Sequence, residues 1–219
     1  MRNTNTPIAA EGYPFIAGFA AVTALLGLPG QYLHPGFFFP AGIFMFLTIF
    51  TLFFFRNPER STPGNENWVV APADGVVIFS GETTEPHTST QMEKISIFMS
   101  VFNVHVNRAP ISGKVLDGFY TKGKFYDVRD ERATFENEQQ GLVLETATGA
   151  RMVVVQVAGL IARRIVCYAK VGDLLTRGRR YGLIRFGSRL DIYLPLGTRV
   201  KVSMGQKTVA GETVLGILP

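Results

Sequence analysis

The chain has 219 residues, of which 47% are hydrophobic and 18% are charged. This composition is too apolar and too poor in charge for a disordered or coiled-coil chain. The single cysteine, Cys167, excludes an internal disulfide and a zinc site built from cysteines, and it favours a reducing compartment.

The first 55 residues differ sharply from the remainder. They contain 11 of the 18 phenylalanines, and their only formal charges are Arg2 and Glu11. Stretches this long without charge are typical of membrane segments. Glycines and prolines near the middle divide the stretch into two apolar runs, Tyr13 to Leu28 and Phe37 to Phe55. We therefore expect a membrane-anchoring hydrophobic hairpin over residues 1–55. The first run has 16 residues, so a re-entrant hairpin and a spanning one both stay open.

The basic residues around this hairpin predict its orientation. Arg2 precedes it, Arg56 and Arg60 follow it, and the connection between the two runs has no Lys or Arg. Because basic residues are retained on the cytoplasmic side, both flanks are expected there. The predicted location is the cytoplasmic face of the inner membrane.

Residues 56–219 read as a β-rich domain. Short β-branched and aromatic runs alternate with turns that contain glycine, and the one candidate helix is a short turn at residues 130–137. The closing segment, Lys201 to Leu215, resembles the last hairpin of barrel-sandwich domains. We predict a mainly β fold, a compact β-sandwich or barrel of the barrel-sandwich-hybrid kind, preceded by the N-terminal membrane helical hairpin. The expected strands are 68–70, 76–79, 95–106, 115–120, 142–146, 152–157, 165–169, 190–194 and 200–204.

Basic residues gather between positions 163 and 189, where Asp173 is their acidic neighbour. Such a window suits lipid headgroups, phosphate or nucleic acid, and an adjacent membrane anchor favours the lipid. A solvated charged face is the alternative. The window contains Arg163, Arg164, Lys170, Arg177, Arg179, Arg180, Arg185 and Arg189.

Three polar residues are candidates for chemistry, and each also has a structural interpretation. His105 lies in a strand-like run in which alternation places it on one face with Asn103 and Asn107, although spacing alone favours a buried core histidine. Asp74 either begins an Asp-Gly turn or orients a histidine. Ser188 follows Gly187 without the G-x-S-x-G pattern of a nucleophile elbow, so a plain turn is the default. No pattern indicates a metal site.

Six segments, taken in order, resemble the short, membrane-associated phosphatidylserine decarboxylase proenzymes. Each segment is a weak motif by itself, but the ordered set is specific and extends from about Phe54 to the C-terminus. The segments are 54–60, 71–75, 101–110, 137–138, 155–159 and 186–188.

The resemblance implies a pyruvoyl-dependent carboxy-lyase that converts phosphatidylserine to phosphatidylethanolamine and CO2. Its covalent pyruvoyl group, which forms a Schiff base with the substrate, would derive from Ser188. Autocatalytic serinolysis at Gly187-Ser188 would split the proenzyme into a large chain, 1–187, and a small pyruvoyl chain, 188–219. Asp74 and His105 would complete a Ser-His-Asp set for that step, and His105 is the first choice for the proton of the decarboxylation.

The expected partners are phosphatidylserine or a related serine phospholipid, the lipid bilayer, and the two cleavage products as a heterodimer, with further dimerisation left open. No nucleic acid is expected. The alternative is a non-catalytic, membrane-tethered β-sandwich adaptor or carrier, which would remain one intact chain. The predicted ligands of the substrate phosphate are Arg163, Arg164, Arg185 and Arg189.

Overall fold

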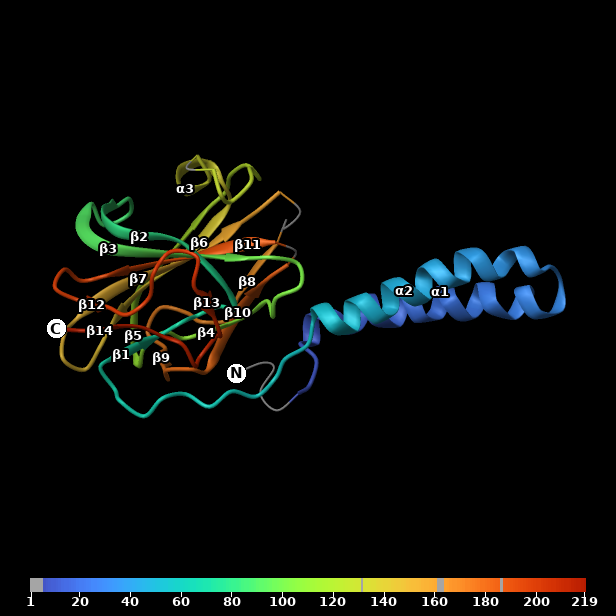
Figure 1. Cartoon of the computed structure of the whole chain (residues 1–219), viewed down its shortest axis with the longest axis horizontal. Helices are drawn as coiled ribbons and strands as arrows, with labels where there is room; N and C mark the ends of the chain where they lie inside the picture. The colour runs from blue at the N-terminus through green and yellow to red at the C-terminus, as the bar shows by residue number, and fades with distance from the viewer. Residues whose placement is uncertain (1–5, 131, 161–163, 186) are drawn as a thin grey trace. The chain divides into compact units, whose positions relative to one another are not determined.

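The computed structural model describes residues 6–130, 132–160, 164–185 and 187–219. The chain forms two compact units, one that ends at Pro58 and one from Glu59 to Pro219. The first unit is helical and the second is built from strands (Figure 1).

The helical unit is an antiparallel pair, α1 (Tyr13–Tyr32) and α2 (Phe38–Phe54), joined by the short 3-10 turn η2 (Pro35–Phe37) and preceded by η1 (Ala10–Gly12) (Figure 1). Most of its large apolar side chains face outward; Phe39, for example, is 79% exposed. A continuous exposed apolar surface of this kind needs a lipid or protein covering. By length and composition both helices could cross a membrane.

The first helix is longer than its apolar run indicates. It continues past Pro29 to Tyr32, because a proline in the last turn removes only one backbone hydrogen bond, and Leu33 N still donates to the Pro29 carbonyl. Of the two breaks that the glycines and prolines predict, the one at Pro35-Gly36 lies between the helices, whereas Gly27 to Gly30 continue α1. With 20 residues, α1 has about the length of a perpendicular membrane crossing.

Hydrogen bonds close the base of the hairpin. Ala9 N donates to the Phe55 carbonyl at 2.8 Å, and Asn57 N donates to the Pro7 carbonyl at 2.8 Å. The entering and leaving segments are thus tied to each other at the base of the helical pair.

The strand unit is dominated by a curled antiparallel sheet, which in the described residues has eight strands in the order β13-β2-β3-β11-β7-β6-β5-β9 (Figure 1). Two smaller sheets, β1-β14-β12 and β4-β10-β8, complete the unit. The mainly β fold predicted from the sequence is confirmed. The bounds are β1 Trp68–Val70, β2 Gly75–Glu85, β3 Thr90–Met99, β4 Val106–Arg108, β5 Gly113–Thr121, β6 Gln139–Glu145, β7 Arg151–Ala158, β8 Ile165–Cys167, β9 Leu174–Leu175, β10 Arg180–Ile184, β11 Ser188–Leu194, β12 Arg199–Val200, β13 Lys207–Thr208 and β14 Val214–Ile217.

Both faces of the large sheet are covered, so all seven residues of β11 are buried. One face carries the main core, to which Leu190, Ile192 and Leu194 contribute. The opposite face carries a second cluster that includes Tyr193 and Val157, and Val128 from the segment 122–138 packs onto it. Because successive side chains of a strand alternate between faces, alternate residues of β11 contribute to the two clusters.

The single strand expected at residues 95–106 is interrupted. The structure has β3 up to Met99, then a turn, and then β4 from Val106. Asn103 makes the break, because its Oδ1 accepts hydrogen bonds from Ser100 N at 2.9 Å and Ser100 Oγ at 2.8 Å. Side-chain bonds of this type compete with strand pairing. His105 therefore lies at the end of a turn and not within a strand.

The half-buried Cys167 provides a test of the packing under β8. Burial raises the pKa of its thiol to about 11. A raised pKa leaves less thiolate at a given pH, so at pH 8 the reactive form is roughly a hundredfold scarcer than in an ordinary thiol. We expect slow alkylation by iodoacetamide in the native protein, increasing about tenfold for each pH unit between pH 8 and 10. Equal labelling rates in native and denatured protein at pH 8 would contradict this packing.

Candidate active site

Ser188 is the first residue of β11 and lies between two neighbouring strands. Its register partners are Met99 on β3 and Ala158 on β7. The residue is 0% exposed, and its Oγ donates to the Met99 sulfur at 3.4 Å. A thioether is a weak acceptor. The sheet therefore fixes the backbone of Ser188, whereas its hydroxyl makes only a weak hydrogen bond.

The peptide bond before Ser188 is shaped by two glycines. Gly187 has a φ of +69°, in the left-handed region that favours glycine. Gly159, just after β7, packs against the Gly187 carbonyl: a Cβ at position 159 would lie 2.5 Å from that oxygen. The carbonyl group preceding Ser188 thus occupies a place that only a glycine at 159 leaves open.

His105 points its imidazole at Gly187, the residue before Ser188. Its Nδ1 lies 2.9 Å from the Asn103 carbonyl oxygen, so Nδ1 carries the proton and donates it to that oxygen. The other nitrogen, Nε2, accepts a hydrogen bond from Gly187 N at 3.3 Å. His105 is 2% exposed. The structure therefore places an unprotonated imidazole nitrogen, a potential base, one residue from the Ser188 hydroxyl.

Asp74 does not meet this histidine. Its carboxylate accepts from Arg60 Nη2 at 3.0 Å and from Ala210 N at 2.8 Å, while the Asn103 carbonyl occupies Nδ1 of His105. The structure thus brings together Ser188, Gly187 and His105 but leaves Asp74 on a neighbouring turn. That Asp74 assists the histidine stays a prediction.

Arg189 faces away from Ser188, on the other side of the sheet. It is 4% exposed, and its guanidinium contacts the Asp191 carboxylate at 2.8 Å and donates to the Val128 carbonyl at 2.6 Å. Adjacent residues of a strand point to opposite faces. The sequence-based prediction of Arg189 as a phosphate ligand beside Ser188 is corrected accordingly: this arginine fastens the segment 122–138 to the sheet.

Asp191 is the anion of that buried group. Lys94 Nζ lies 3.3 Å from its carboxylate, so two cations share one acid. Burial alone would raise the pKa of Asp191, but the charges of Arg189 and Lys94, together with hydrogen bonds from Arg189 and Ser96, lower it below its usual value. The carboxylate is therefore ionised at neutral pH, and its one negative charge is shared between the two cations.

Two of the remaining predicted phosphate ligands, Arg164 and Arg185, lie on neighbouring backbone segments. Arg185 N donates to the Arg164 carbonyl at 3.2 Å, so the two residues are paired through their backbones two positions before Gly187. Arg164 is exposed and Arg185 is half-buried. Arg163 lies outside the described residues.

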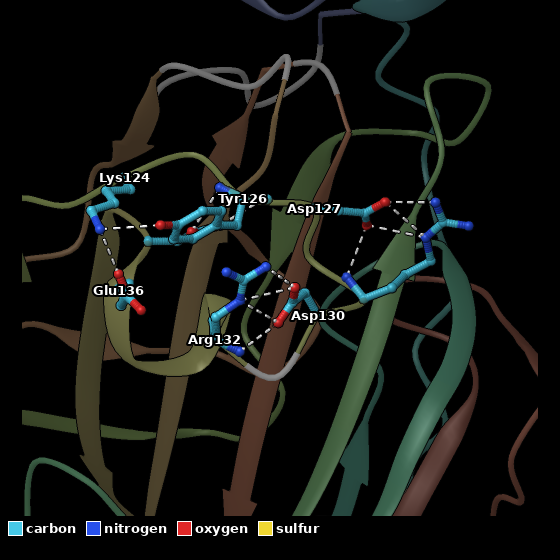
Figure 2. Close-up of polar contacts among 8 residues, drawn as sticks. Lys124, Tyr126, Asp127, Asp130, Arg132 and Glu136 are labelled. Carbon is cyan, nitrogen blue, oxygen red and sulfur yellow. Dashed lines mark hydrogen bonds and ion pairs between the residues drawn. The ribbon is translucent and has the colours of Figure 1, made fainter.

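The segment 122–138, which contains the short helix α3 (Ala133–Glu136), covers the sheet beside Ser188. Figure 2 shows its ion pairs: Lys124 with Glu136 at 2.8 Å, and Asp130 with Arg132 at 2.7 Å. Asn137 ties the segment to the sheet, because its Nδ2 donates to the carbonyl of Ala158, the register partner of Ser188, at 2.8 Å. The expected short helix is confirmed within 130–137.

Several residues of this arrangement escaped the sequence reasoning. Gly159 and Met99 contact the candidate site, yet no chemical motif assigns either contact; Asn103, which was expected on the same face as His105, instead holds the histidine through its backbone carbonyl. Asn137 and Gly159 lie in segments that carried the family resemblance, which was the available signal. In the described part of the chain, no group of three or more His, Cys, Asp or Glu side chains could hold a metal ion.

Comparison with known proteins agrees with this geometry. A family model described as phosphatidylserine decarboxylase matches residues 47–216. A protein named phosphatidylserine decarboxylase proenzyme from Citrifermentans bemidjiense is 82% identical over 219 residues, covering 100% of both chains. Proteins of the same name from Geobacter metallireducens and Pelobacter propionicus are 69% and 58% identical, again over 100% of each chain. The chain belongs to the phosphatidylserine decarboxylase family, as its motifs predicted.

The buried cations on the face of the sheet opposite Ser188 give a stability prediction. Asp191→Ala leaves Arg189 and Lys94 uncompensated, so we expect the free energy of unfolding to fall by about 3–5 kcal/mol. The matched control is Glu145→Ala, which breaks an outer pair with the exposed Arg151 and should cost less than about 1 kcal/mol. Denaturant unfolding of the full-length protein in detergent micelles, followed by Trp68 fluorescence, measures both. Equal losses would contradict the role assigned to Asp191.

Proposed function

We propose that this chain is a pyruvoyl-dependent phosphatidylserine decarboxylase, which converts phosphatidylserine to phosphatidylethanolamine and CO2 after cutting its own backbone before Ser188. The observation that carries the proposal is the position of His105, whose unprotonated Nε2 accepts a hydrogen bond at 3.3 Å from the N–H of Gly187, the residue whose carbonyl is attacked. Family membership supplies the reaction class. A non-catalytic adaptor has no comparable support.

The cut begins with the Ser188 hydroxyl. Its Oγ attacks the Gly187 carbonyl carbon while His105 Nε2 takes the hydroxyl proton, because a serine hydroxyl is a weak nucleophile without a base. The C–N bond to Ser188 then breaks, the proton passes to the departing nitrogen, and an ester joins Gly187 to Oγ. The Gly187 carbonyl carbon is sterically accessible to this attack, because glycine has no Cβ.

Elimination completes the maturation. Loss of the Ser188 α-proton expels the Gly187 carboxylate and leaves a dehydroalanine at position 188. Water then replaces its nitrogen, which departs as ammonia, and a pyruvoyl group remains at the start of the small chain. The products are chains of residues 1–187 and 188–219.

The surroundings of position 188 suit a pyruvoyl group. The change replaces a hydroxymethyl by a methyl group, and the Ser188 hydroxyl is bonded to the thioether of Met99, which packs well against a methyl group. Once formed, the group supplies an electron sink, since its ketone condenses with the substrate amine and accepts the electron pair released as CO2 leaves. His105 then holds a proton beside the reacting carbon, where it can return it to the product.

The remaining residues place the lipid. Two helices of membrane-spanning length keep the chain at a bilayer, where the acyl tails of the substrate remain. The proposed ligands of the substrate phosphate are Arg163, Arg164 and Arg185. Arg185 lies two positions before Gly187, and its backbone is hydrogen-bonded to that of Arg164. The arginines that flank the hairpin support a position of the active unit at the cytoplasmic face of the inner membrane.

Replacing the serine tests the proposal directly. Purified wild-type protein should appear on a denaturing gel as two chains, the smaller blocked at its N-terminus by a carbonyl that borohydride reduces. Ser188→Ala should remain one chain, because no hydroxyl can attack, whereas the control Ser203→Ala should be cut normally. Folded wild-type protein that persists as one chain with an ordinary serine at 188 would overturn the proposal.

Gly159 offers a geometric test of the same step. Gly159→Ala introduces a Cβ that would lie 2.5 Å from the Gly187 oxygen, so the carbonyl must move away from Ser188 and His105. A misplacement of this size costs about a hundredfold in rate, which a time course of cleavage on gels can measure. The control is Gly81→Ala, whose Cβ would approach no atom closer than 3.8 Å. Cleavage of Gly159→Ala at the wild-type rate would show that the carbonyl is not positioned there.

A further inference from the structure

Two buried amide side chains lie in the core next to the candidate site. Gln156 on β7 donates from Nε2 to Oδ1 of Asn107 on β4 at 2.8 Å. Both residues are 0% exposed. Gly182 on β10 is pressed against this pair, since a Cβ there would lie 3.0 Å from Gln156 Nε2. The fold therefore makes room for an amide pair in an otherwise apolar interior.

The pair is incompletely satisfied. Gln156 Oε1 has no hydrogen-bond donor among the described residues. Asn107 Nδ2 donates to the Met99 sulfur at 3.8 Å, which is a long contact with a weak acceptor. A buried acceptor without a donor destabilises the fold, and an apolar residue of similar size would avoid that cost. The free acceptor of Gln156 and the weakly bonded donor of Asn107 therefore indicate a ligand that carries a hydrogen-bond donor next to an acceptor.

The position of the pair identifies where that ligand sits. Gln156 is the register partner of Leu190, two residues after Ser188, so its side chain is on the same face as the Ser188 hydroxyl. Diagonal neighbours of this kind lie within reach of long side chains. Met99 contacts both centres, through Ser188 Oγ at 3.4 Å and Asn107 Nδ2 at 3.8 Å.

We propose that Gln156 and Asn107 form the subsite for the amino-acid head of the lipid substrate. Gln156 Oε1 accepts a hydrogen bond from the substrate amine nitrogen, and Asn107 Nδ2 donates to the substrate carboxylate. The inference rests on the proposed function, because that reaction brings an amine and a carboxylate to position 188. Neutral amides suit this task, since the amine and the carboxylate both change charge during the reaction. In the uncut chain the pair has no such role, so self-cleavage does not require it.

The experiment uses full-length protein with Gln156→Met, Asn107→Leu or the control Gln140→Met. Gln140 is the register neighbour of Gln156 on β6, and its Nε2 already donates to the Gly141 carbonyl. Gels first establish that each variant is cut before Ser188. The cut proteins are then mixed with micelles that contain phosphatidylserine or phosphatidylethanolamine and reduced with cyanoborohydride. The mass of the small chain reports the lipid trapped on it, independently of CO2 release.

We expect normal cleavage in all three variants. Gln156→Met should trap both lipids at least about tenfold more slowly than wild type, because both carry the amine. Asn107→Leu should slow trapping of phosphatidylserine by a similar factor and leave phosphatidylethanolamine, which lacks the carboxylate, within twofold of wild type. Gln140→Met should match wild type. Gln156→Glu, which keeps an acceptor oxygen, should recover part of the trapping rate that Gln156→Met loses.

Two results would overturn the inference. One is trapping of both lipids by Gln156→Met at the wild-type rate. The other is a Gln156→Met chain that keeps the wild-type unfolding midpoint but is not cut, because the amide would then serve maturation. An equal effect of Asn107→Leu on both lipids would remove the assignment of the carboxylate. Failure of the wild-type chain to cut itself would instead defeat the proposed function, so the two failures are distinguishable.

Discussion

The pairing of β11 with β3 on one side and β7 on the other is the constraint on which the site depends. It sets Ser188 opposite Met99 and Ala158, and it directs the hydroxyl toward the core face of the sheet. Backbone ladders on both sides hold a strand far more rigidly than a loop is held. A reaction between a side chain and its own preceding peptide needs such precision, because the attacking atom and the carbonyl belong to neighbouring residues.

The same strand separates two kinds of environment. The core side near Ser188 contains polar groups with weak or missing hydrogen bonds. They are the thioether of Met99, the Nε2 of His105, and the amides of Gln156 and Asn107. On the opposite side, one step along the chain, a carboxylate and two cations form a compact ionic group that binds the covering segment 122–138. Strong electrostatics thus stabilise the scaffold, while the reacting side keeps groups that change partners easily.

The sequence was sufficient for the hairpin, the β class and the family, because long apolar runs and short β-branched runs are read locally. It failed where a single side chain decides the local path. Asn103 ends a strand that the apolar pattern would continue to Val106, and Pro29 does not end a helix that it was expected to break. Arg189 was predicted to bind phosphate because it lies in a basic window, but β11 already begins at Ser188, so the alternation of side chains turns Arg189 to the face opposite Ser188. Gln156 was visible as a polar residue between two valines, but the sequence does not show whether its amide finds partners.

The proposed cut falls at the start of the central strand, and this has a topological consequence. The small product would contain β11, β12, β13 and β14, which lie in the middle of the large sheet, at its β13 edge, and in the sheet that β1 shares. The small chain therefore pairs with strands of the large chain at several separate places, so the two chains could dissociate only if both unfolded. Cleavage of the backbone should therefore leave the two chains associated. The new N-terminus at position 188 is hydrogen-bonded to β3 and β7 from the moment it forms, so it does not fray into solvent.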